Sequence, residues 1–129
     1  MINDEIYLQV LIKGIKTAAA YIYEDDIISY SFQMKEIKRF AKLYDLDIRN
    51  WYYDNNPKRV NCYTMAHNSP SEDCGCIIAY RPDRMFDRVD DYDRFMEILQ
   101  NNAVLFFCLD FFDETKISRD LIFRRFHLS

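Results

Sequence analysis

The chain has 129 residues, 50% of them hydrophobic, and a formal net charge of −4 at pH 7. This length suits one domain with a substantial core, and a content of only 2 Gly and 3 Pro argues against disorder. No apolar run is long enough to span a bilayer, and the first residues do not resemble a secretory signal, so we expect a cytoplasmic protein without membrane contact. The negative charge also excludes a chain that is basic throughout, as a general nucleic-acid binder would be.

A helix is predicted at the N-terminus, over residues 3–13. Asn3 can cap this helix and Gly14 can end it. Apolar side chains recur on one face of it, and we expect that face to pack against the domain. These side chains are Leu8, Leu11, Ile12 and Ile15.

Beyond that helix, short apolar runs alternate with segments of helical periodicity. In chain order we predict a strand over 18–23, a helix over 31–44, a strand over 46–53, a short helix over 59–66, a loop over 67–73, a strand over 76–80, a polar break over 81–87, a helix that includes 92–99, a strand over 103–109 and a helix over 116–128. This alternation predicts an α/β fold of three layers, αβα, with a mostly parallel sheet of about four to five strands. Residues 1–129 are expected to form this one domain.

Acidic side chains follow every predicted strand. They are Glu24, Asp25, Asp26, Asp54, Asp83 and Asp110. Because ligands lie beyond the carboxyl ends of parallel strands, this edge is the candidate site. Carboxylates gathered there would hold Mg²⁺ and support phosphoryl transfer or nuclease-like chemistry. The alternative, which we favour, is that they cap helices and keep the loops solvated.

The cysteines do not form a strong metal motif. Cys62, Cys74 and Cys76, even with His67, lack the paired CxxC spacing of structural zinc sites. Cys76 and Cys108 fall in predicted strands, where cysteine behaves as a small hydrophobic residue. We therefore predict no metal and no cofactor.

The run that carries a family resemblance is Ala79-Tyr80-Arg81-Pro82-Asp83-Arg84-Met85. It resembles the strand-end motif of the serine recombinase catalytic domain, in the resolvase and invertase family, which reads Tyr, a basic residue, any residue, Asp-Arg and Leu. Gln33, the helical residues 37–42 and the run 46–48 are similar to the first helix and following strand of that family. The resemblance spans about 17–126 and implies a resolvase-like fold.

The resemblance also implies positions for a catalytic site. In that family a serine after the first strand attacks a DNA phosphodiester, and arginines stabilise the developing charge. Asp83 and Arg84 match the Asp-Arg of the motif, Arg59 falls near the arginine that begins the second helix, and Gln33 matches a glutamine of the first helix.

This chain departs from the family at the first strand, which ends Tyr21-Ile22-Tyr23-Glu24-Asp25. The family has Tyr, any residue, Arg, any residue and Ser there. Tyr23 thus replaces an arginine, Asp25 replaces the nucleophile, and Asp87 replaces a later arginine of the motif. Added carboxylates oppose phosphodiester binding, so we expect Asp25 to be inactive and strand exchange to be lost.

Nearby hydroxyls, Ser29 and Ser31, lie beyond the strand-end position and are weaker candidates for a nucleophile. The predicted helix within 1–15 is an addition to the family pattern, and we expect no DNA-binding module after the last helix.

These departures predict a stand-alone, degenerate recombinase-like domain that serves as a protein-interaction or regulatory module linked to DNA recombination or mobile elements. The expected partner is a second copy or a full-length recombinase. Residual, salt-dependent DNA contact would use arginine side chains. These are Arg81, Arg84, Arg124 and Arg125.

Overall fold

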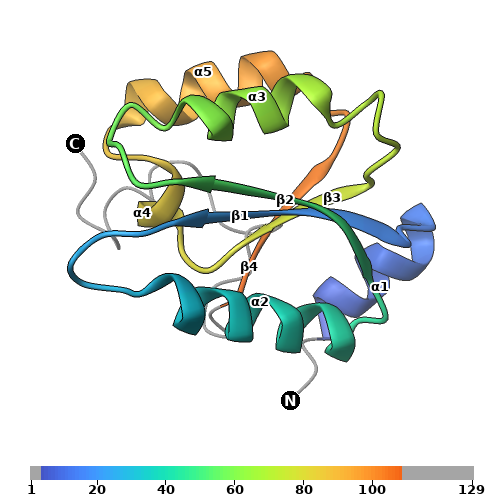
Figure 1. Cartoon of the computed structure of the whole chain (residues 1–129). Coiled ribbons are helices and arrows are strands. Elements are labelled where there is room, and N and C mark those ends of the chain that lie inside the picture. The colour runs from blue at the N-terminus through green and yellow to red at the C-terminus, as the bar shows by residue number, and fades with distance from the viewer. Residues whose placement is uncertain (1–3, 109–129) are drawn as a thin grey trace.

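The computed structural model describes residues 4–108 (Figure 1). Its elements are α1 (Asp4–Lys13), β1 (Thr17–Tyr23), α2 (Tyr30–Leu43), β2 (Asp47–Asp54), α3 (Val60–Asn68), β3 (Cys76–Ala79), α4 (Pro82–Met85), α5 (Val89–Leu99) and β4 (Val104–Phe107). No helix within 4–108 has the length and the apolar composition needed to cross a membrane. The predicted helix over 116–128 lies outside the described residues, as do Asp110, Arg124 and Arg125.

The four strands form one parallel sheet in the order β2-β1-β3-β4. β1 is central: it pairs with β2 as far as Tyr23 opposite Asp54, and with β3 as far as Tyr21 opposite Ala79. Because all the strands run the same way, their carboxyl ends share one edge of the sheet. That edge collects the loop after β1, the loop after β2 and the short helix α4.

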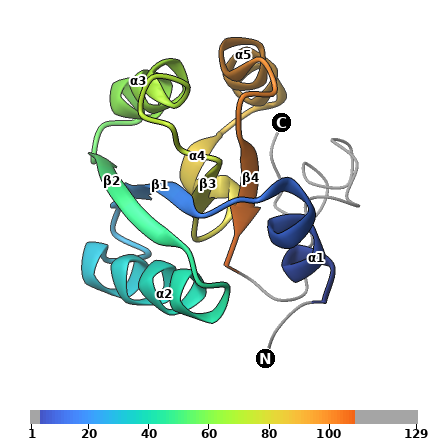
Figure 2. The ribbon, with the colours of Figure 1, turned by 90° about the vertical axis from the view of Figure 1, so that its right-hand side faces the viewer.

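Helices cover both faces of the sheet. α3 and α5 lie on one face, and α1 and α2 lie on the other (Figure 2). Successive strand residues point to opposite faces, so Tyr21 and Ile77 join the core under α3 and α5, whereas Ile22 and Ile78 join the core over α2. The predicted three-layer α/β fold is confirmed.

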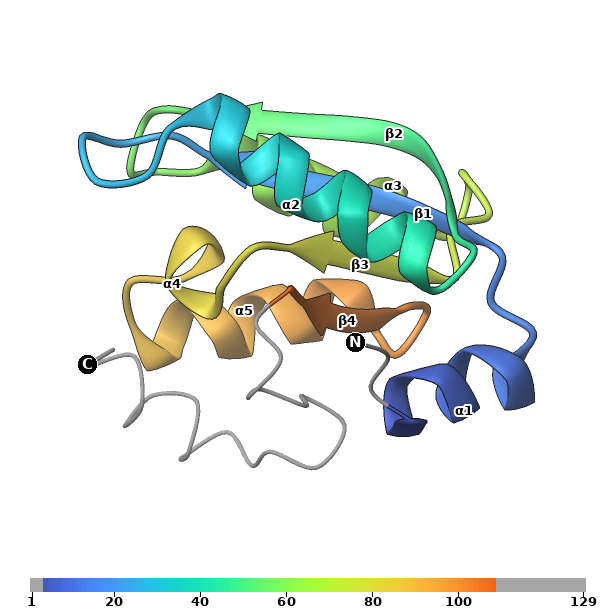
Figure 3. The ribbon, with the colours of Figure 1, turned by 90° about the horizontal axis from the view of Figure 1, so that it is seen from below.

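The predicted buried face of the first helix is wrong for the residues within α1, whereas Ile15, which follows the helix, is buried as predicted. α1 lies beside the β4 side of the sheet (Figure 3), where Ile6 and Val10 are buried in the same core cluster as Phe106. Leu8 and Ile12, on the predicted face, are exposed. Both sides of this helix are apolar, so its periodicity did not distinguish the face that packs.

Two predicted irregular segments contain helix. α3 continues through Asn68, because the hydroxyl and the backbone N–H of Ser69 both donate to the carbonyl of Met65, at 2.8 and 3.0 Å. In the predicted polar break, Pro82 begins one turn of helix that closes when the N–H of Phe86 donates to the Pro82 carbonyl. This turn holds the Asp-Arg pair at the edge of the sheet.

The assignment of the α1 face predicts opposite outcomes for two isoleucines of this segment. Ile6 is 4% exposed and Ile12 is 81% exposed. Ile6→Ala should lower the free energy of unfolding by about 2–4 kcal/mol, because it leaves a cavity. Ile12→Ala, the matched control, should change it by less than about 0.5 kcal/mol. Urea denaturation measures both, and equal losses would contradict the assigned face.

Candidate functional site

Three arginines lie at the carboxyl edge of the sheet, each at or near the start of a helix. Arg59 precedes α3, Arg81 precedes α4, and Arg84 lies within α4. Arg59 and Arg84 are buried, although a guanidinium stays charged at all ordinary pH values. Such side chains require partners that replace water.

Arg84 is 3% exposed and takes its partners from the end of β1. Its Nη1 donates to the carbonyl of Tyr23 at 3.2 Å and lies 3.0 Å from Oδ2 of Asp25. Its Nε is 3.5 Å from Oδ1 of Asp83, too far for a good hydrogen bond. Asp25 is therefore the main counter-ion of this buried charge.

The loop after β1 holds Asp25 in place. Its Oδ1 accepts hydrogen bonds from the backbone N–H groups of Ile27 and Ile28, at 2.9 and 3.0 Å. Partial burial raises the pKa of Asp25, but these two hydrogen bonds and the charge of Arg84 outweigh it and leave the pKa below its ordinary value of 3.8. Asp25 is thus a carboxylate at neutral pH, and it faces Arg84.

Arg59 joins the loop after β2 to α4. Its Nη1 lies 2.7 Å from Oδ2 of Asp87, its Nε donates to the Arg84 carbonyl at 2.9 Å, and its Nη2 donates to the Asp83 carbonyl at 3.3 Å. The guanidinium carbon is 4.0 Å from the ring centroid of Tyr23. Burial lowers the pKa of Arg59, but the hydrogen bond and charge of Asp87 outweigh burial and raise it overall.

The backbone of Arg59 is strained. Its φ of 49° and ψ of 48° lie in the left-handed region, which non-glycine residues rarely adopt. Such a conformation persists only where the surroundings impose it. The guanidinium contacts with α4 supply that constraint, so this arginine fixes the position of the loop.

The third arginine, Arg81, forms a two-pronged ion pair. Its Nε and Nη2 donate to the two carboxylate oxygens of Asp83 at 2.8 and 2.7 Å. The three arginines and their three carboxylates form what we call the neutralised arginine cluster. Its members are Arg59, Arg81, Arg84, Asp25, Asp83 and Asp87.

Gln33 supports this cluster from α2. Its side-chain nitrogen donates to the carbonyls of Tyr23 and Ile28 at 2.7 and 3.1 Å, and the side chain is buried. It therefore fastens both ends of the loop that carries Asp25. Ser29, within that loop, caps α2, because its Oγ accepts a hydrogen bond from the N–H of Phe32 at 3.2 Å.

The other carboxylates at this edge have structural partners. Asp54 accepts hydrogen bonds from the Tyr21 hydroxyl at 2.8 Å and from the N–H of Cys62 at 3.1 Å. Glu24 accepts from the N–H of Tyr30 at 3.1 Å, at the first turn of α2. Across residues 4–108, no group of three or more His, Cys, Asp and Glu side chains is placed to hold a metal ion.

The structure brings most of the predicted site residues together. Asp83, Arg84, Arg59 and Asp25 form one connected network, and Gln33 joins it through the Tyr23 carbonyl. The sequence interpretation placed Asp87 and Tyr23 at arginine positions of the family motif, but it did not foresee their contacts with Arg59. The sequence did carry one signal for these contacts: the acidic residues near the three arginines are about as numerous as the arginines, as expected for ion pairs.

Comparisons with known proteins agree with this architecture. No protein-family model matches the sequence, and no curated protein is similar to it. The structure is similar to that of a resolvase-family site-specific recombinase from Streptococcus pneumoniae, with a TM-score of 0.65 and 17% identity, over 82% of this chain and 80% of the other. It is also similar to the N-terminal catalytic domain of TP901-1 integrase, with a TM-score of 0.65 and 15% identity, over 87% of this chain and 92% of the other. The chain therefore has a fold like that of the serine recombinase catalytic domain, as the sequence resemblance predicted.

Arg59→Ala should lower the free energy of unfolding by roughly 2–3 kcal/mol, because it removes charge-assisted hydrogen bonds and leaves buried carbonyls of α4 without donors. Arg39→Ala, at an exposed position of α2, is the matched control and should change it by less than about 0.5 kcal/mol. Chemical denaturation measures both. An Arg59→Ala protein as stable as the control would contradict the structural role of Arg59.

The lowered pKa of Asp25 also predicts how the stability of the folded protein depends on pH. Its pKa is lowered in the folded state, so its contribution to stability is present above the unfolded-state pKa, near 3.8, and is lost as the pH falls through the folded-state value. Asp25→Asn should therefore lower the melting temperature at pH 7 and weaken its decline below pH 4. If the melting temperatures of the two proteins declined equally with falling pH, the Asp25–Arg84 ion pair would be contradicted.

Proposed function

We propose that this chain is a non-catalytic relative of recombinase catalytic domains, and that it acts as a protein-interaction or regulatory module linked to DNA recombination. One observation carries the proposal. Each of the three arginines of the neutralised arginine cluster is paired with a carboxylate of the chain itself, at 2.7 to 3.0 Å.

Electrostatics supports the loss of phosphodiester chemistry. A phosphodiester that approached Arg84 would be attracted by one positive charge and repelled by Asp25, which lies 3.0 Å from the same guanidinium. At similar distances the attraction and the repulsion are of similar size, so little net attraction remains. The same holds at Arg59, where Asp87 lies 2.7 Å away. Binding there would first require these ion pairs to break.

The chemistry of the strand end supports the same conclusion. By the family resemblance Asp25 stands where a nucleophilic serine would be, and its carboxylate is already engaged with Arg84 and two backbone N–H groups. Ser29, the nearest serine in sequence, is engaged as the cap of α2. A covalent phosphoserine mechanism would need a free, activated hydroxyl at this edge.

A recombinase-like fold whose charged edge is neutralised internally supports a role in protein interaction over a role in catalysis. We propose that the partner is a second copy or a full-length recombinase, in the cytoplasm. DNA contact is a minor part of this proposal, because Arg81 and Arg84 are both occupied by carboxylates. Any such contact would weaken steeply with salt.

The test is incubation of the purified protein with supercoiled and nicked DNA, with Mg²⁺ and with a chelator, followed by denaturing electrophoresis. We expect neither cleavage nor a covalent protein–DNA adduct, while an active resolvase-family recombinase serves as the positive control. Asp25→Ser should also be inactive, since Tyr23 and Asp87 still stand at arginine positions of the family motif. A metal-independent adduct would contradict the proposal, and metal-dependent cleavage would favour the nuclease-like alternative.

A further inference from the structure

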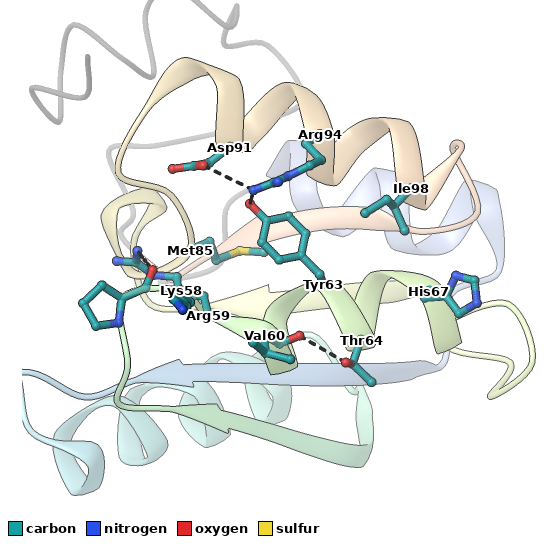
Figure 4. Close-up of a pocket in the computed structure, with 11 residues that line it drawn as sticks. Lys58, Arg59, Val60, Tyr63, Thr64, His67, Met85, Asp91, Arg94 and Ile98 are labelled. Carbon is teal, nitrogen blue, oxygen red and sulfur yellow. Dashed lines mark hydrogen bonds and ion pairs between the residues drawn. The ribbon is translucent and has the colours of Figure 1, made fainter.

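A groove of ≈ 800 Å³ runs between α3 and α5, on the face of the sheet opposite α2 (Figure 4). Its apolar lining includes Val60, Met85 and Ile98, and the ring of Tyr63 projects between the two helices. Val60 is 63% exposed at the first position of α3. A hollow of this size accepts several apolar side chains at once.

A weak contact crosses the groove. Arg94 on α5 donates to the Tyr63 hydroxyl at 3.3 Å, and its guanidinium carbon lies 4.7 Å from the centroid of that ring. Asp91 is 3.8 Å from the same guanidinium. The Arg94 side chain is 64% exposed, so these contacts contribute little and an incoming group can replace them at small cost.

The lining of the groove has more cationic than anionic side chains, although the chain as a whole carries −4. Three cationic side chains line it, Lys58, Arg59 and Arg94, against one carboxylate, Asp91. Arg59 is already paired with Asp87, whereas Lys58 makes no ion pair with any residue of the described range 4–108.

The opposite end of the groove carries both charges. A second hollow, of ≈ 490 Å³, shares His67, Arg94 and Ile98 with the groove and adds Glu97 and Gln100 to the lining. The unpaired cation Lys58 and the carboxylate Glu97 therefore lie at different ends. A ligand with acidic groups along one part of its length would bind in one direction only.

We propose that this groove binds an amphipathic helix of a partner protein, whose apolar side chains enter between α3 and α5 and whose acidic residues face Lys58 and Arg94. A groove between two neighbouring helices suits a third helix, because side chains spaced three and four residues apart enter it together. This inference rests on the proposed interaction role and names the surface and the chemistry of the partner.

The test uses a fluorescent synthetic helix-forming peptide that carries Leu and Phe on one face and Glu elsewhere, with fluorescence anisotropy to measure binding. Lys58→Glu should weaken binding at least about fivefold, because it reverses the unpaired charge of the groove. Val60→Ser should weaken it through loss of apolar contact. Lys38→Glu, an exposed site on α2 beyond the sheet, makes the same charge change and should bind like the unaltered protein.

Backbone amide shifts in NMR spectra should locate the peptide on α3 and α5, and a peptide with Lys in place of Glu should bind much more weakly. Absence of binding by the folded protein, equal binding of both peptides, or shifts confined to another face would overturn the inference. Self-association that Lys58→Glu abolishes would assign the groove to a second copy instead and would also overturn it. The DNA adduct assay is independent: an adduct refutes the proposed function, whereas failed peptide binding without an adduct refutes only this groove.

Discussion

The buried guanidinium of Arg84 is the constraint on which the carboxyl edge of the sheet depends. A permanent charge that is 3% exposed must find counter-charge and hydrogen-bond acceptors within the protein. It finds them at the end of β1, in the Tyr23 carbonyl and the Asp25 carboxylate. This requirement fixes the loop that leads into α2, and Gln33 fastens both ends of the same loop. Arg59 then ties the next loop to α4 through the carbonyls of Asp83 and Arg84.

In the neutralised arginine cluster, the fold keeps arginines at the usual ligand-binding edge, but their carboxylate partners change what that edge can bind. The parallel sheet and its helices place three arginines where a fold of this kind presents ligand-binding groups. The same loops also place Asp25, Asp83 and Asp87 against them, so the charges are satisfied within the chain. A shared architecture does not by itself imply a shared reaction, because reactivity depends on which side chains occupy the site. Here the site stabilises the edge of the domain.

Sequence periodicity was sufficient to predict the strands of the sheet and the helices that have one apolar face. Ile37 and Phe40 on α2, and Phe95 and Leu99 on α5, are three or four residues apart, the spacing of one helix face, and all four are buried. α1 was misjudged because both of its sides are apolar, and only the position of the sheet decides between them. Contacts between loops could not be predicted from the sequence either, because the pairing of Arg59 with Asp87 depends on how α3 and α4 are arranged in space. The groove had a signal in the spacing of Val60, Tyr63 and His67, but one helix face does not reveal the facing helix.

The most direct test of the account is an NMR titration of the arginine side chains with inorganic phosphate, in which the Nε–H signal of each guanidinium is followed separately. Because Arg59 and Arg84 are buried and paired with carboxylates, their signals should resist exchange with solvent and should not shift as phosphate is added. A saturable shift of either signal would mean that an anion displaces Asp25 or Asp87. That result would contradict the claim that the chain's own carboxylates neutralise the arginines at this edge.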